Sequence, residues 1–82
     1  MAENSKQVAL TLTCLDAPSI QVSFEPEGAV HELRQGDQIR VEISGPDDGD
    51  VEISYLPVGI AVGAWAGATT RAWNRAGEEL RL

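Results

Sequence analysis

The fold class is decided by the stretch from Gln35 to Tyr55, which reads QGDQIRVEISGPDDGDVEISY. In two runs, 38–44 and 51–55, apolar residues alternate with polar ones. A two-residue period is typical of a β-strand with one apolar face and one solvated face. The residues between the runs, 45–50, are glycine, proline and aspartate, which favour turns. The stretch therefore predicts an antiparallel hairpin over 38–55.

Two registers of this hairpin keep the apolar side chains of both runs on one face. Pairing Ile43 with Val51 would bring two glutamates, at 42 and 52, directly opposite each other, which is unfavourable. Pairing Ile43 with Ile53 avoids that repulsion and is the register that we expect. Because an isolated hairpin is marginal in water, other strands must cover its apolar face, to which Ile39, Val41, Ile53 and Tyr55 should contribute.

The remaining sequence supplies these strands. Residues 8–15 and 20–24 alternate in the same way and, being separated by a short turn, should pair with each other. Residues 29–34 show no clean period and are expected to be extended and irregular. The polar residues 1–7 should form a flexible tail, which leaves 8–82 as a single β domain. Further strands are expected in 58–64 and 69–75, and the closing segment 78–82 should bring Leu80 and Leu82 to the core.

We therefore predict an all-β fold, a small antiparallel β-sandwich or partly open barrel of six or seven short strands. The length of 82 residues fits one domain with a small core. Thirteen acidic residues against six basic ones give a formal charge of -7. That balance argues against binding nucleic acid through its phosphates and against anionic membrane surfaces. It is also an ordinary solubility charge for a small domain.

The single cysteine, Cys14, cannot form an internal disulfide, whereas small secreted domains usually contain several. No stretch is apolar for long enough to form a membrane-spanning helix, and residues 1–7 lack the apolar core of a signal peptide. These observations favour a cytoplasmic protein.

Catalytic and metal-binding patterns are weak. His31 is the only histidine, and no cysteine accompanies it at a spacing that suits zinc. Cys14 is in phase with Leu10 and Leu12, which indicates a small core residue rather than a nucleophile. The acidic residues at 47–50 match an EF-hand loop only in part. We expect no enzyme activity, no cofactor and no metal site.

The most unusual feature is the clustering of tryptophan and arginine late in the chain, at Trp65, Arg71, Trp73 and Arg75. Tryptophan and arginine are enriched at the energetic centres of protein interfaces. The alternative is that both tryptophans fill the core of a domain poor in large side chains. The leading hypothesis is a non-catalytic protein-interaction module or assembly subunit that uses these four residues, with a protein partner or self-association.

Two other function classes stay open. The same tryptophans could stack on sugar rings in a small-ligand or glycan-binding β-module. The negative charge could instead belong to an acidic inhibitor that mimics nucleic acid and occupies a basic groove.

Overall fold

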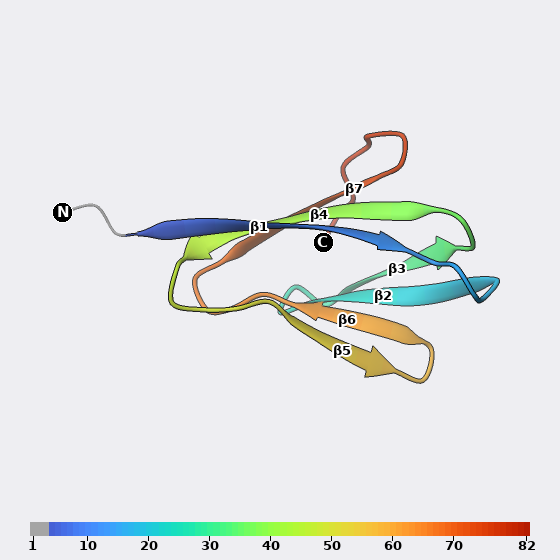
Figure 1. Cartoon of the computed structure of the whole chain (residues 1–82), viewed down its shortest axis with the longest axis horizontal. Helices are drawn as coiled ribbons and strands as arrows, with labels where there is room; N and C mark the ends of the chain where they lie inside the picture. Colours follow the sequence, from blue (N-terminus) through green and yellow to red (C-terminus); the bar gives the residue numbers. More distant parts are fainter. Residues whose placement is uncertain (1–3) are drawn as a thin grey trace.

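Seven β-strands make up the fold in the computed structural model, which describes residues 4–82 (Figure 1). No helix occurs among these residues, and so none of them forms a helix that could cross a membrane. The strands are β1 (Ser5–Thr13), β2 (Ser19–Glu25), β3 (Ala29–Arg34), β4 (Gln38–Pro46), β5 (Glu52–Leu56), β6 (Gly59–Gly63) and β7 (Thr69–Asn74).

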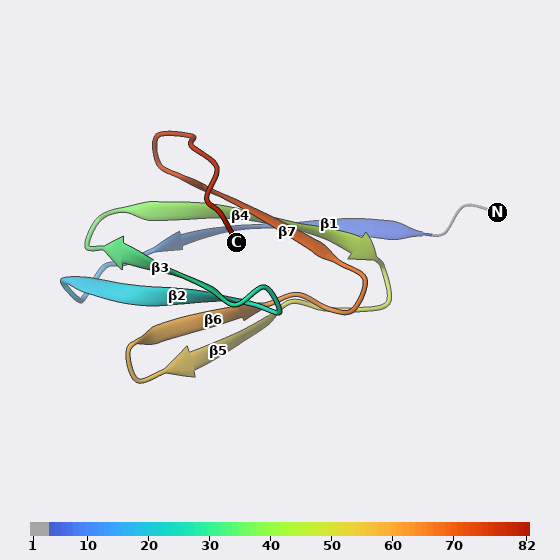
Figure 2. The same ribbon diagram turned by 180° about the vertical axis from the view of Figure 1, so that it is seen from behind.

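The strands form two sheets that face each other. One has three strands in the order β1-β4-β7, and the other has four in the order β3-β2-β6-β5 (Figures 1 and 2). All neighbours are antiparallel except β2 and β6, which run parallel. The predicted all-β fold is confirmed, and of the two expected architectures the chain adopts the sandwich, with sheets that do not close into a barrel.

The core lies between the sheets and follows from the two-residue period. Side chains at alternate positions of β2 and β4 are almost completely buried, and those between them reach the outside. Phe24 is the largest of the buried side chains. The buried core residues are Cys14, Val22, Phe24, Leu33, Ile39, Val41, Ile43, Val62 and Ala72.

The predicted 38–55 hairpin is wrong, although both of its strands exist. β4 pairs with β1 on one edge and with β7 on the other, so no edge is left for β5, and the Ile43–Ile53 register does not occur. The segment 47–51 instead crosses from one sheet to the other, where β5 pairs with β6. The hairpin in this part of the chain is β5–β6, joined by the two residues Pro57 and Val58.

Two other predictions about strands need correction. The segment 20–24 does not pair with 8–15, because β2 lies in the opposite sheet, between β3 and β6. The segment 29–34 is a regular strand in which Ala29, His31 and Leu33 point inward. Its alternation is hard to see in the sequence because one inward residue is polar, while Val30 points outward and is 55% exposed.

The N-terminal tail is shorter than expected. β1 begins at Ser5, and its first three residues pair with Ser44–Pro46 of β4. These paired residues correct the expectation of a flexible tail over 1–7, and residues 1–3 lie outside the described part of the chain.

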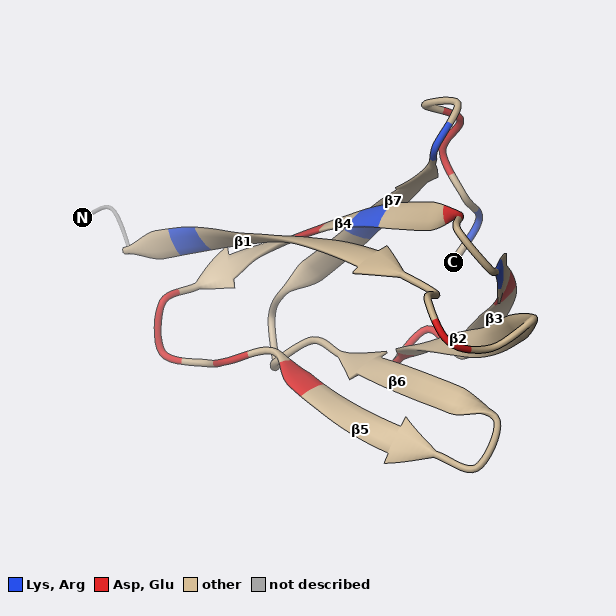
Figure 3. Ribbon diagram, turned by 45° about the vertical axis from the view of Figure 1, so that its right-hand side comes forward, with Lys and Arg blue, Asp and Glu red and all other residues tan. Residues whose placement is uncertain are grey.

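β5 has the predicted phase but not the predicted burial. Ile53 pairs with Val62 and Tyr55 with Ile60, so both are in register with core residues of the same sheet. Ile53 is nevertheless 43% exposed and Tyr55 is 91% exposed. β5 is the edge strand farthest from the three-stranded sheet, which does not extend over it (Figures 1 and 3). The expectation that these two side chains lie in the core is wrong.

Candidate functional site

The outer face of the three-stranded sheet brings together three of the four residues singled out in the sequence. Ala72 points into the core, so its neighbours Arg71 and Trp73 point outward, and Arg75 follows in the same phase. Trp73 lies opposite Arg40 of β4, which also points outward. We call Arg40, Arg71, Trp73 and Arg75 the Trp73 face.

Arg71 lies over the half-buried Trp73 ring, and Arg40 is the partner of Trp73 in the β4–β7 pair. The guanidinium carbon of Arg71 lies 5.1 Å from the ring centroid, within the range of a cation–π interaction. The three arginines of the face amount to half of the six basic residues of the chain. Each is paired with an acidic side chain: Arg40–Glu42 at 3.1 Å, Arg71–Glu79 at 2.8 Å and Arg75–Asp37 at 3.6 Å.

The residues after β7 complete this face. The chain turns at Gly77, whose φ of 85° suits a residue without a side chain, and returns along the free edge of β7. Glu79 then pairs with Trp73, and the backbone N–H of Leu80 donates to the carbonyl of Ala72 at 2.8 Å. Leu80 packs against the core from this position, as expected for the last segment. The turn thereby places Glu79 beside Arg71.

Arg71 donates two hydrogen bonds to the Glu79 carboxylate, from Nε to Oε2 at 3.0 Å and from Nη2 to Oε1 at 2.8 Å. These hydrogen bonds favour the charged form of both groups, so they lower the pKa of Glu79 and raise the pKa of Arg71. Because the folded-state pKa of Glu79 lies below its unfolded value, its stabilising contribution is fully present above the unfolded pKa. That contribution is lost as the pH falls through the folded pKa.

We expect the Glu79 carboxyl to titrate below the ordinary glutamate value of 4.5. The Arg71→Gln substitution removes the two charged donors and should return the pKa to the ordinary range. An NMR titration of the side-chain carboxyl carbons measures this directly. Arg34→Gln is the control, since Arg34 pairs with Glu32 on β3 and should leave the Glu79 titration unchanged. An unchanged Glu79 pKa in Arg71→Gln would contradict the assignment.

A shallow hollow of about 370 Å³ lies on this face. The flat polar groups of Gln38, Arg40 and Asn74 border it beside the Trp73 ring, and Glu42, Arg75 and Gly77 complete its lining. Such a surface combines one large aromatic ring with hydrogen-bonding groups held by ion pairs. It suits a flat partner surface better than an enclosed small molecule.

Trp65 lies elsewhere. It follows the end of β6, packs against the core, and donates a hydrogen bond from Nε1 to the Pro46 carbonyl at 2.7 Å. The Lys6 ammonium lies 5.3 Å from its ring centroid. Pro46 ends β4 six residues after Arg40, which is about 20 Å along an extended strand. The four predicted residues therefore do not form one surface, because Trp65 is separated from the other three.

In the sequence, Trp65 is out of phase with Ile60 and Val62, so we expect it either to lie outside the core or to be turned inward by a bulge near Gly63. The ring is half-buried against the core, but no bulge is required, because β6 ends at Gly63 and the chain leaves the sheet. Gly49 makes room for the ring. A Cβ atom at Gly49 would overlap the Trp65 indole.

Sequence reasoning missed Arg40 and Glu79, which join the face through strand pairing rather than through spacing in the chain. The remaining candidates lie apart from it. His31 points between the sheets, with its Nε2 2.8 Å from the carbonyl oxygen of Arg81. The buried Cys14 thiol donates to the carbonyl of Ala17 at 3.3 Å. Asp50, in the acidic segment 47–50, pairs with Lys6 at 3.3 Å.

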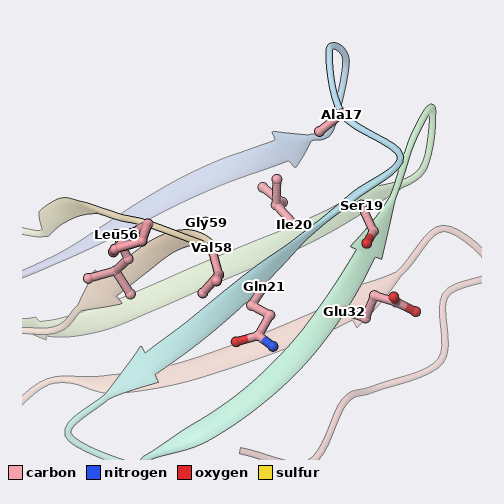
Figure 4. Close-up of a pocket in the computed structure, with 9 residues that line it drawn as sticks. Ala17, Ser19, Ile20, Gln21, Glu32, Leu56, Val58 and Gly59 are labelled. Atoms are coloured by element: carbon pink, nitrogen blue, oxygen red, sulfur yellow. The ribbon is translucent and has the colours of Figure 1, made fainter.

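A second hollow, of about 580 Å³, lies over the four-stranded sheet near the β5–β6 turn (Figure 4). Leu56 and Val58 border it on one side, and Gln21 and Glu32 on the other. It passes over Gly59, which has no side chain to fill the space between Gln21 and Leu56. Its polar side chains, Ser19, Gln21 and Glu32, belong to β2 and β3, and no ion pair joins them to one another among the described residues.

No protein-family model, no curated protein and no solved structure matches the chain, so its fold and its surfaces are the grounds for a functional assignment.

Proposed function

We propose that the chain is a non-catalytic protein-interaction module whose contact surface is the Trp73 face. The observation that carries this proposal is the position of Trp73 on an outer sheet face, among three arginines that each have an acidic partner. An aromatic ring at the centre of a patch with a charged rim is the arrangement of interface hot spots.

The ion pairs hold the arginine side chains of this surface in position for contact with a partner. Arg71 is fixed by two hydrogen bonds to Glu79, and Arg75 donates to the carbonyl of Gly36 at 2.7 Å. Holding a long side chain in place before binding reduces the entropy lost on binding. Because each guanidinium has further N–H groups, the face can also donate to carboxylates or backbone carbonyls of a protein partner.

We also propose that the protein is cytoplasmic. Its only cysteine, Cys14, is buried with 3% of its surface exposed and has no cysteine to pair with. Small domains of oxidising compartments are usually stabilised by several disulfides, and this domain relies on its core alone. Partners are therefore sought among cytoplasmic proteins.

The proposal predicts that Trp73→Ala weakens partner binding at least about tenfold, which is the loss typical of a central aromatic residue. The partner is first captured from a lysate of the cells that make the protein, and the affinity is then measured with purified components. Val30→Ala is the matched control, because Val30 is an exposed apolar residue on the other sheet. Equal binding by wild type, Trp73→Ala and Arg40→Ala would contradict the proposed contact surface.

A further inference from the structure

A different surface, the edge of the four-stranded sheet at β5, carries an inference beyond partner binding at the Trp73 face. Ile53 and Tyr55 lie on the side of the sheet that forms the core, yet they are 43% and 91% exposed. Tyr55 is the only tyrosine of the chain, and among residues 4–82 it is the most exposed of the large apolar side chains. A surface of this kind marks an interaction site more often than a scattered single residue does.

The backbone of β5 also has an open edge. In an antiparallel ladder, successive residues direct their N–H and C=O groups to opposite edges of the strand. Pro57 and Val58 form the two-residue loop between β5 and β6. Leu56 therefore directs its N–H and C=O groups toward its partner Gly59 on β6. By alternation, Ile53 and Tyr55 direct theirs to the open edge. β5 contains no lysine or proline, its pairing with β6 is uninterrupted by a bulge, and its one charged residue is Glu52 at its start.

The β5–β6 hairpin carries no charge after Glu52, its first residue, although the protein is acidic. No charged residue occurs between Glu52 and Arg71, although the chain as a whole carries a charge of -7. Figure 3 shows the hairpin free of basic and acidic residues apart from the start of β5. Electrostatic repulsion between two copies of an acidic chain is weakest where the contacting surfaces are uncharged. This surface is therefore suited to contact with a second copy.

We propose that β5 pairs with β5 of a second copy, antiparallel, about a two-fold axis at Ser54. This register places Ile53 opposite the partner copy's Tyr55 and Tyr55 opposite its Ile53, with both pairs on the core side of the sheet. The open N–H and C=O groups of these two residues then face each other and form four hydrogen bonds. The interface is isologous, so it closes with two copies and does not propagate.

Other symmetric registers fit less well. Centring the axis on Tyr55 brings Pro57 into the ladder, where it has no N–H to donate. Centring it on Ile53 pairs Tyr55 with Val51, which lies outside β5. Of the other sheet edges, β1 carries the charged Lys6 in the phase that points to the core, and its apolar side chains are already half-buried. The register about Ser54 uses the whole of β5.

The exposed area sets the strength of the association. The apolar residues exposed on the hairpin, Ile53, Tyr55, Leu56 and Val58, together expose roughly 400 Å² per copy. With the backbone edge, the dimer buries about 1,000 Å² in total, at the lower end of specific interfaces. We therefore expect a reversible dimer with a Kd on the order of tens of micromolar rather than a permanent one.

Sedimentation velocity over a concentration series tests the dimer. The wild-type protein should change from monomer to dimer between about 5 and 500 µM. Tyr55→Lys places a charge on the strand edge and should raise the Kd of the dimer at least about tenfold. Val30→Lys is the matched control, since it changes the net charge equally at an exposed apolar residue of the other edge strand. Wild type that stays monomeric, or equal weakening by both variants, would overturn the proposal.

Cross-linking tests the register independently of the folding of Tyr55→Lys. Across the proposed axis the two Ser54 residues form a non-hydrogen-bonded pair with Cα atoms about 4.5 Å apart, which suits a disulfide. With copper phenanthroline as oxidant, Ser54→Cys should form a covalent dimer much faster than Ser44→Cys, an exposed position on the other sheet. Equal rates for the two variants would overturn the register.

The dimer and the proposed partner binding are separable. Trp73→Ala should dimerise like wild type, because the Trp73 face lies on the other sheet. Tyr55→Lys should retain partner binding at the Trp73 face. Loss of dimerisation in Trp73→Ala would contradict the assignment of two independent surfaces.

Discussion

Gly59→Ala is expected to destabilise the fold by about 3 kcal/mol, while Gly63→Ala leaves it unchanged or slightly more stable. Both glycines lie in β6 and point to the same side of the sheet. A Cβ atom at Gly59 would overlap the carbonyl oxygen of Gln21, and that carbonyl belongs to the backbone of the neighbouring strand β2. A Cβ atom at Gly63 meets only ordinary contacts, the nearest being 3.5 Å from the carbonyl oxygen of Glu52.

The difference between the two variants arises from what must move. At Gly59 the obstacle is backbone that is fixed by pairing, including the hydrogen bond from the Gln21 N–H to the Val58 carbonyl at 2.9 Å. Relief requires β6 to separate from β2, which disrupts the parallel pair at the centre of the four-stranded sheet. At Gly63 nothing moves, and alanine lowers the entropy of the unfolded chain.

Urea unfolding followed by far-ultraviolet circular dichroism measures both effects. A domain of 82 residues has a stability of only a few kcal/mol, so Gly59→Ala should be largely unfolded near room temperature. Gly63→Ala should have the same midpoint as wild type or a higher one. Equal midpoints for the two variants would show that β2 and β6 are not paired as closely as described.

Local alternation made the strands and their faces predictable from the sequence. It located Ile39, Val41 and Ile43 on the buried face of β4, because the period of two is a property of each strand by itself. It did not identify the partners of β4. Turn-forming residues at 45–50 are compatible with a hairpin and also with a crossing between sheets, and only the competition of β1 and β7 for the edges of β4 decides between them.

The burial of the β5 side chains was likewise not predictable from the local sequence pattern. The phase of Ile53 and Tyr55 was predictable, since both residues do lie on the core side of the sheet. Their exposure was not, because it depends on how far the opposite sheet extends, and that extent is a property of the whole fold. An alternating strand at an open edge has the same sequence pattern as a covered one.

The candidate site also contains residues that were predictable from the sequence and residues that were not. Arg71, Trp73 and Arg75 were predictable as one face because they occupy alternate positions along β7 and the residue that directly follows it. Arg40 and Glu79 join them through pairing with β4 and with the C-terminal segment, which no local pattern indicates. Trp65 was grouped with them by proximity in the sequence alone. Its true neighbours, Pro46 and Gly49, are 19 and 16 positions away.

The two tryptophans lie in different environments, so their substitution should affect stability differently. Trp65→Ala is expected to lower the free energy of unfolding by about 3 kcal/mol, and Trp73→Ala by less than about 1 kcal/mol. Removing the Trp65 ring opens a cavity against the core and leaves the Pro46 carbonyl without its 2.7 Å donor. Removing the Trp73 ring opens no cavity against the core and takes away its cation–π contact with Arg71 on an outer face.

Conservative variants separate packing from hydrogen bonding at Trp65. Trp65→Phe keeps most of the ring against Gly49 but removes the N–H donor, so it should lose about 1 kcal/mol. Trp73→Phe should unfold at the wild-type midpoint. Since each substitution removes a fluorophore, circular dichroism in urea is the appropriate measurement. If Trp73→Ala were as unstable as Trp65→Ala, Trp73 would serve the fold, and its outer face would no longer be free for a partner.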